Sequence, residues 1–182
     1  MEIINTPIPD LIILKPRVFK DDRGYFFEAY NDNRYKEAGI KFDFVQDNIS
    51  YSSKNTIRGL HYQIGDFAQS KLVQVVQGKV IDVAVDLRKN SPTFGKHFAI
   101  ELSDENNLQF YIPRGFAHGF SVLSETALFH YKCDNYYNIE SERGIIYNDK
   151  TIGIDWQIEL DKAIVSEKDI ILPTFENATK FD

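Results

Sequence analysis

Short runs of alternating apolar and polar residues, broken at regular intervals by turn-forming residues, constrain the fold of this chain more than any other feature. Residues 80–87 form one such run and follow a turn at residues 77–79. Helix signal is confined to residues 32–38, which end at Gly39, and to a turn near residues 140–143. Short strands at this spacing predict an all-β fold, a sandwich or jelly roll with short peripheral helices. The other predicted strands cover residues 25–30, 72–76, 97–102, 109–112, 120–123 and 127–133.

Composition limits the class of protein. The 182 residues, 43% hydrophobic and 26% charged, fit a single globular domain over residues 1–182. The net charge of -6 argues against a broad basic surface for nucleic acid, so any cationic groups that bind a ligand must be local. The amino-terminal residues do not resemble a secretion signal, and no stretch of ~20 apolar residues could span a bilayer. The only cysteine, Cys133, excludes an internal disulfide, and we expect a cytoplasmic protein in which Cys133 packs as a small apolar residue.

Two segments each place a histidine close to glycine, Arg58-Gly-Leu-His-Tyr-Gln63 and Pro113-Arg-Gly-Phe-Ala-His-Gly119. In a barrel of strands, His61 and His118 are predicted to share one site. The second segment fits the Pro-x-Gly-x-x-His element of the cupins, the metal-binding double-stranded β-helix proteins.

The first segment departs from that pattern. Gln63 stands where a metal-binding cupin has its second histidine, and residues 64–70 contain Asp66 but no glutamate. An imidazole, an amide and one loose carboxylate would hold a divalent ion weakly. The sequence therefore predicts a cupin-like barrel that works without a metal.

Cationic residues occur beside predicted turns and strand edges. The guanidinium groups of Arg23 and Arg58 are suited to grip phosphate oxygens, and Lys71 adds a further positive charge. In an acidic chain this pattern suggests a phosphorylated small-molecule ligand, although each residue taken alone could be a solvated surface charge.

Proton transfer is the chemistry that the histidines favour. His61 could be a general base, and a carboxylate such as Asp169 would orient its ring. Tyr131 is a candidate acid. A structural histidine and a packing tyrosine remain alternative interpretations, and His97 and His130, which lack any companion motif, are expected to be structural.

Over nearly its whole length the chain resembles the dTDP-4-dehydrorhamnose 3,5-epimerases. Many motifs carry the resemblance in the same order. They are Asp22–Glu28, Gln46–Ser50, Arg58–Gln63, Lys71–Val73, Asp86–Gly95, Pro113–Phe120, Tyr131-x-Cys133, Glu142–Ile145, Asn148-Asp149, Gly153–Trp156 and Ser166–Asp169.

The resemblance implies a cofactor-free epimerase that acts next to the C4 ketone of a dTDP-sugar. It implies that His61, oriented by Asp169, removes a proton, that Tyr131 returns one from the opposite face, and that Lys71 stabilises the enolate oxygen. A fixed cation where charge develops is a strong catalytic device. The implied substrate contacts are Arg23, Glu28, Gln46, Asp47, Asn48, Arg58, His118, Glu142 and Lys168.

The sequence leaves other functions open. Tyr136 and Tyr137 match positions that orient the sugar, where small changes could restrict turnover to C3. A nucleotide-sugar binding module without catalysis and a metal-dependent cupin enzyme are further alternatives. The resemblance also implies a homodimer in which an amino-terminal strand pairs with the partner's sheet, and the apolar run at residues 11–14 is compatible with burial at such an edge.

Overall fold

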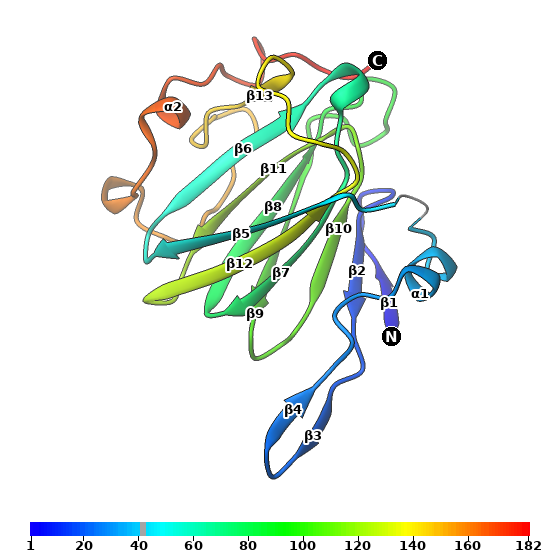
Figure 1. Ribbon diagram of the computed structural model, residues 1–182. Coiled ribbons are helices and arrows are strands. Elements are labelled where there is room, and N and C mark those ends of the chain that lie inside the picture. Colours follow the sequence, from blue (N-terminus) through cyan, green and yellow to red (C-terminus); the bar gives the residue numbers. More distant parts are fainter. Residues whose placement is uncertain (41–42) are drawn as a thin grey trace.

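Two antiparallel sheets face each other in a computed structural model that describes residues 1–40 and 43–182 (Figure 1). The first sheet has six strands in the spatial order β1-β2-β10-β7-β12-β5. Its strands are β1 (Glu2–Asn5), β2 (Ile12–Lys15), β10 (Gln109–Ile112), β7 (Lys71–Gln77), β12 (Thr126–Cys133) and β5 (Gln46–Ser53).

The second sheet has five strands in the order β13-β6-β11-β8-β9. Apart from β8 and β9, neighbours along the sheet are not consecutive in the chain, so the strands wind between the two layers rather than forming a simple meander. This arrangement is a jelly roll of the cupin-like kind and confirms the predicted fold class. The strands are β13 (Glu142–Gly144), β6 (Ile57–Gln63), β11 (Phe116–Val122), β8 (Lys79–Asp86) and β9 (His97–Ser103).

Both faces of the central strands β8 and β11 are buried, and because alternate residues of a strand point to opposite sides, these strands contribute to two cores. Along β8, Val80 and Ala84 join the core between the sheets, whereas Val83 and Val85 join a second core on the outer face. The segment after β13 covers this outer face and contributes Trp156, which is 1% exposed. Figure 1 shows the segment, in orange and red, running along the outer side of β6.

The helices are short and peripheral, as predicted. The predicted helix at 32–38 is α1 (Asp32–Glu37), which the side chain of Asn31 caps by accepting a hydrogen bond from the Arg34 amide. No helix within the described part of the chain is long and apolar enough to cross a bilayer. The remaining helical elements are the 3₁₀ turns η1 (Gly65–Phe67) and η2 (Leu160–Lys162) and the helix α2 (Glu167–Ile170).

Two local predictions differ from the structure. Of the strand expected at 25–30, only β4 (Gly24–Phe26) forms, paired with β3 (Phe19–Asp21) in a hairpin that projects away from the barrel (Figure 1). The turn expected at 140–143 ends earlier, and residues 142–144 form β13 because they pair with the end of β6.

The apolar run at residues 11–14 is already buried within its own chain. Strand β2 lies between β1 and β10, and Leu11 and Leu14 are 1% and 0% exposed. The run therefore does not lie at an edge of its sheet, where β1 is the outermost strand, and its burial is no evidence for pairing with a partner.

Candidate active site

The two histidine segments lie side by side in the five-stranded sheet. Strands β6 and β11 are paired so that His61 and His118 are directly opposite. Glycine makes this approach possible: a Cβ on Gly59, whose φ is +128°, would lie 2.5 Å from the Cα of Gly119. The glycines in these two segments therefore bring the imidazoles into one site.

His61 is bonded to a buried carboxylate from the far end of the chain. Its Nε2 lies 2.8 Å from Oδ1 of Asp169, and the His61 side chain is 25% exposed whereas that of Asp169 is 3% exposed. The Gly59 amide donates to Asp169 Oδ2 at 3.4 Å, and the Ser166 hydroxyl accepts from the Asp169 amide at the start of α2.

The electrostatics keep this carboxylate ionised. Burial alone would raise the pKa of Asp169, but the hydrogen bond and charge of His61 and the Gly59 amide hold that pKa below its ordinary value. An ionised Asp169 fixes the proton on His61 Nε2 and leaves Nδ1 as the basic nitrogen.

His118 has a carboxylate partner of its own. Its Nε2 lies 3.0 and 2.9 Å from the two oxygens of Asp82 on the adjacent strand β8, and both side chains are buried. Burial lowers the pKa of His118, and the attraction to Asp82 opposes that shift only in part. The His118 ring is therefore held neutral.

A phenol and an ammonium group project from the opposite sheet. Tyr131 on β12 and Lys71 on β7 are neighbours, with the Lys71 nitrogen 5.9 Å from the centre of the Tyr131 ring. Burial raises the pKa of Tyr131, so its hydroxyl stays protonated near neutral pH, and burial lowers the pKa of Lys71. In residues 1–40 and 43–182 the Lys71 ammonium has no hydrogen-bond or ion-pair partner.

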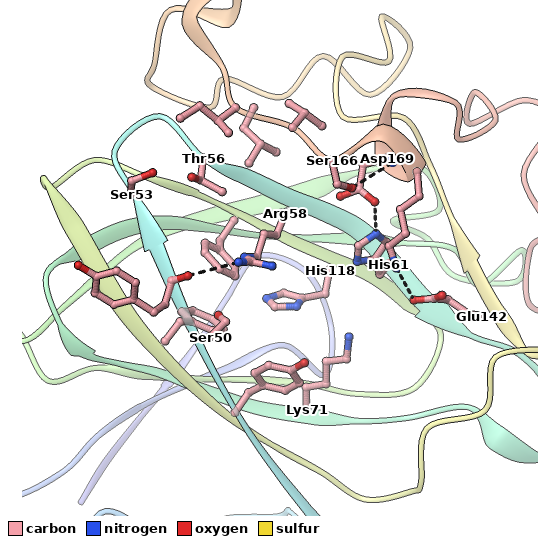
Figure 2. Close-up of a pocket in the computed structure, with 18 residues that line it drawn as sticks. Ser50, Ser53, Thr56, Arg58, His61, Lys71, His118, Glu142, Ser166 and Asp169 are labelled. Atoms are coloured by element: carbon pink, nitrogen blue, oxygen red, sulfur yellow. Dashed lines mark hydrogen bonds and ion pairs between the residues drawn. The ribbon is translucent and has the colours of Figure 1, made fainter.

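These groups line one pocket between the sheets, with a volume of about 560 Å³ (Figure 2). Figure 2 shows four labelled residues reaching the same space, Arg58 and His61 from β6, His118 from β11 and Lys71 from β7. The structure thus brings together eight predicted residues, which are Arg58, His61, Lys71, His118, Tyr131, Glu142, Lys168 and Asp169.

A smaller hollow of about 150 Å³ continues from the pocket and shares His61, Lys71, Tyr131 and Glu142 with it. Two more predicted residues, Gln46 and Asn48 on β5, line this hollow. Both therefore lie where a ligand that extends beyond the larger pocket would meet them.

Three predicted contacts do not lie in the pocket. The side chain of Asp47 is on the outer face of β5, where it pairs with Lys132 at 2.7 Å, because alternate residues of a strand point in opposite directions. Arg23 is at the turn of the β3–β4 hairpin and pairs with Asp21 at 2.6 Å. Glu28 pairs with Arg34 of α1 at 2.7 Å.

Some pocket residues were not predicted. Ser50 lies on the same face of β5 as Asn48, and its buried hydroxyl has no hydrogen-bond partner among the described residues. Ser52, the next residue on that face, accepts a hydrogen bond from Arg58 Nε at 2.9 Å. The alternating polar residues 46, 48, 50 and 52 are the signal that could have identified this face. Asp82 gave no such signal, because it lies within an apolar run.

Gln63, which stands where a metal-binding cupin has its second histidine, uses its side chain for hydrogen bonds to the backbone. The amide of Gln63 bonds to the backbone of residues 67, 136 and 138. No group of three histidine, cysteine or acidic side chains suited to a metal ion occurs in the residues that the structure covers.

Comparisons with known proteins agree closely with one another. A family model described as dTDP-4-dehydrorhamnose 3,5-epimerase matches residues 5–177. A protein of that name from Shigella flexneri is 51% identical over 182 residues, 100% of this chain and 99% of the relative. The crystal structure of such an epimerase from Elizabethkingia anophelis matches with a TM-score of 0.92 and 55% identity over 97% of both chains. A Legionella pneumophila enzyme in complex with dTDP-4-keto-L-rhamnose matches with a TM-score of 0.93 and 48% identity, over 97% of this chain and 93% of that one.

Proposed function

The chain belongs to the dTDP-4-dehydrorhamnose 3,5-epimerase family and is an isomerase, and we propose that His61 removes and Tyr131 returns the proton at each carbon that is inverted. The substrate is dTDP-4-dehydro-6-deoxy-D-glucose, and inversion at C3 and C5 gives dTDP-4-dehydro-L-rhamnose. The Legionella relative, crystallised with that product sugar, supports this choice.

The observation that carries the proposal is the placement of base and acid on opposite sheets. His61 lies on β6 of one sheet and Tyr131 on β12 of the other, and both line the same pocket. Nδ1 of His61 takes the proton from a carbon next to the C4 ketone, and the electron pair moves to the ketone oxygen as an enolate. Tyr131 then gives its hydroxyl proton to the opposite face of that carbon, which inverts the centre.

The remaining residues bind the substrate and stabilise the intermediate. Lys71 places an otherwise unpaired cation beside Tyr131, where the enolate charge would develop. Arg58 and Lys168 are suited to the diphosphate, because they are cationic groups at the same pocket. His118, Glu142, Gln46 and Asn48 complete the proposed contacts, and the reaction needs no cofactor because the ketone already acidifies both carbons.

A homodimer is part of the proposal. Arg23 and Glu28 lie outside the pocket of their own chain, on or beside a hairpin that projects from the barrel (Figure 1). They can act as substrate contacts only at the pocket of a second copy. Exposed aromatic side chains on the same hairpin, Phe19, Tyr25 and Phe26, support burial against a partner. Asp47 has no contact role in this proposal, since its side chain pairs with Lys132 and lines neither hollow. The free buried thiol of Cys133 supports a cytoplasmic setting.

Proton NMR in deuterated water tests the reaction. We expect the protein to introduce deuterium at both C3 and C5 of the 4-keto sugar, with the product trapped by the reductase that acts on 4-dehydro-L-rhamnose. Prior treatment with a chelator should not change the rate. Exchange at C3 alone would indicate a C3-epimerase, and binding without exchange would indicate a binding module.

The mass of the protein in solution tests the dimer. A strict monomer with full activity would exclude any role of Arg23 and Glu28 at a second pocket. If the protein is an active dimer and the Arg23→Ala variant binds the substrate more weakly, the result would support a role of Arg23 at the pocket of the second copy.

A further inference from the structure

Gln63 is buried at the edge of the active site, and every donor of its amide is used. It lies two residues after His61 on β6 and is 4% exposed. Its Nε2 donates to the carbonyls of Phe67 at 2.7 Å and Tyr136 at 3.1 Å, and its Oε1 accepts from the Asn138 amide at 2.7 Å. Because both N–H groups are engaged, the amide has no donor left for a ligand.

Two of these bonds fall on either side of Tyr137. These bonds hold the peptide groups immediately before and after Tyr137 and so restrain its backbone. The Tyr137 amide donates to Gln46 Oε1, and its hydroxyl donates to Glu142 Oε2, each at 3.1 Å. Glu142 is in turn paired directly across the sheet from Gln63. Gln63 thus closes a ring of contacts around Tyr137.

This ring lines the smaller hollow of the site. Gln46, Gln63, Tyr137 and Glu142 all contribute to its wall, together with the reacting residues His61 and Tyr131. Tyr137 is 53% exposed, so packing alone does not hold its side chain in place. Hydrogen bonds must do so.

Other bonds hold the start of the same loop but not its centre. Gln69 donates to the Asn135 carbonyl at 2.7 Å, and the Ser70 amide donates to Asp134 Oδ1 at 2.7 Å. Neither reaches the peptide groups that flank Tyr137. Loss of Gln63 would therefore leave the loop attached to the barrel, while the backbone of Tyr137 itself would keep, among the described residues, only its bond to Gln46.

We propose that Gln63 is a positioning residue that holds Tyr137 against Glu142 and so sets how the nucleotide sugar lies over His61. The position that would bind a metal in a related barrel instead controls the shape of the sugar site. This inference rests on the proposed function and deepens it, because it names a determinant of substrate affinity and of the balance between reaction at C3 and C5.

Affinity for dTDP-D-glucose, an analogue without the ketone, tests the proposal apart from catalysis. We expect Gln63→Met to raise its Kd about tenfold, as one misplaced contact would. The matched control is Gln109→Met, which removes another buried glutamine that bonds to Ala29 and Gln74 but lies outside both hollows. Its Kd should stay within about twofold of the wild-type value.

A double-mutant cycle separates positioning from general weakening. If Gln63 acts through Tyr137, the Kd of Gln63→Met/Tyr137→Ala should be no higher than that of the worse single variant. For Gln109→Met/Tyr137→Ala the effects should multiply. With the 4-keto substrate, Gln63→Met should also change the ratio of deuterium at C5 to that at C3 at least about threefold, because the sugar sits differently over the base.

Several results would overturn the proposal. Wild-type affinity in Gln63→Met, or an effect that multiplies with Tyr137→Ala, would remove Gln63 from the positioning role while leaving the epimerase reaction intact. Failure of the wild-type protein to bind dTDP-D-glucose would instead reject the proposed function and this inference together. If Gln63→Met does not fold, Gln63→Glu keeps the side-chain volume and the acceptor for the Asn138 amide, and its Kd should still rise because it cannot donate to Tyr136. Unchanged affinity in Gln63→Glu would count against the proposal.

Discussion

His61 and His118 lie opposite each other on adjacent strands, and each bonds through Nε2 to an aspartate, yet the two pairs differ in burial and origin. His61 is partly exposed, and Asp169 comes from a helix in the covering carboxyl-terminal segment. His118 is buried, and Asp82 comes from the neighbouring strand of the same sheet.

This difference in burial suits the two histidine–aspartate pairs to different roles. A partly exposed imidazole beside an ionised carboxylate can accept a proton from a ligand and release it to water. A buried imidazole whose pKa is lowered cannot become charged without a large desolvation cost, so it serves as a fixed neutral hydrogen-bonding group. The comparison therefore supports the proposal that His61 transfers protons, and it favours a positioning role for His118.

The largest expected effect is on turnover when each imidazole is replaced. His61→Asn should lower kcat by about 10³-fold or more, because it removes the general base. His118→Asn should lower kcat/KM by only about tenfold, because one hydrogen bond to the substrate is lost. Exchange of deuterium at C3 and C5 measures both. Equal losses of turnover in the two variants would contradict the different roles proposed for His61 and His118.

Replacing the carboxylates should separate activity from stability. Asp169→Asn should lower kcat about 10²-fold, since the amide no longer fixes the tautomer and orientation of His61. Asp82→Asn should instead lower the free energy of unfolding by about 1–3 kcal/mol, because a buried charged hydrogen bond is weakened. Turnover assays and urea unfolding distinguish the two. A larger loss of turnover in Asp82→Asn would reverse the assignment.

The free energy of unfolding should depend on pH in two separate ranges, one set by His118 and one by Asp169. The folded pKa of His118 lies below its unfolded value of about 6.5, so the unfolded chain binds a proton first as the pH falls. Stability is then lost below pH ~6.5, by at most about 1.4 kcal/mol per pH unit. Asp82, Lys71 and His61 are the charged or titratable groups that influence this proton.

The Asp169 carboxyl contributes in a lower range. Its folded pKa is also lowered, so its contribution is present above about pH 4 and is lost only as the pH falls further. Urea unfolding from pH 8 to pH 3 measures both ranges. His118→Gln should flatten the curve between about pH 6.5 and 5, whereas Asp169→Asn should leave that part unchanged. The opposite pattern would show that His118 is not held neutral.

The smallest expected effect concerns the segment that carries Asp169. Ser166→Ala removes the hydroxyl that caps α2, a change that costs about 1 kcal/mol in a typical helix. Because Asp169 is in that first turn, kcat should fall about threefold. Glu167→Ala, in the same turn but outside the pocket, is the control and should leave kcat unchanged. A fall in that variant would mean that the whole helix, not the cap, positions the carboxylate.

Much of this architecture is local and could be read from the chain. The alternation in residues 80–87 and 127–133 identified β8 and β12, because the side-chain period of a strand is a property of the backbone. The two histidine segments predicted that His61 and His118 share one site, and the structure places these residues opposite each other on paired strands. The motifs that resemble the family indicated Tyr131 and Lys71, and both line the pocket.

The placement of other residues needed the folded molecule. The contact between His61 and Asp169 spans 108 residues and depends on apolar packing of the carboxyl-terminal segment against β6, which no local pattern specifies. The alternation of side chains along β5 places the Asp47 side chain on the face away from the pocket. The projecting β3–β4 hairpin places Arg23 outside the pocket of its own chain.

The chain by itself thus determined the strands, the close pair of histidines and the kind of chemistry, because these depend on backbone periodicity and side-chain type. Only the tertiary structure decided that Asp82 meets His118, how deeply each imidazole is buried and which backbone groups bond to the amide of Gln63. Those features depend on packing between distant segments, and it is packing that sets local burial and hence the protonation state of each pair.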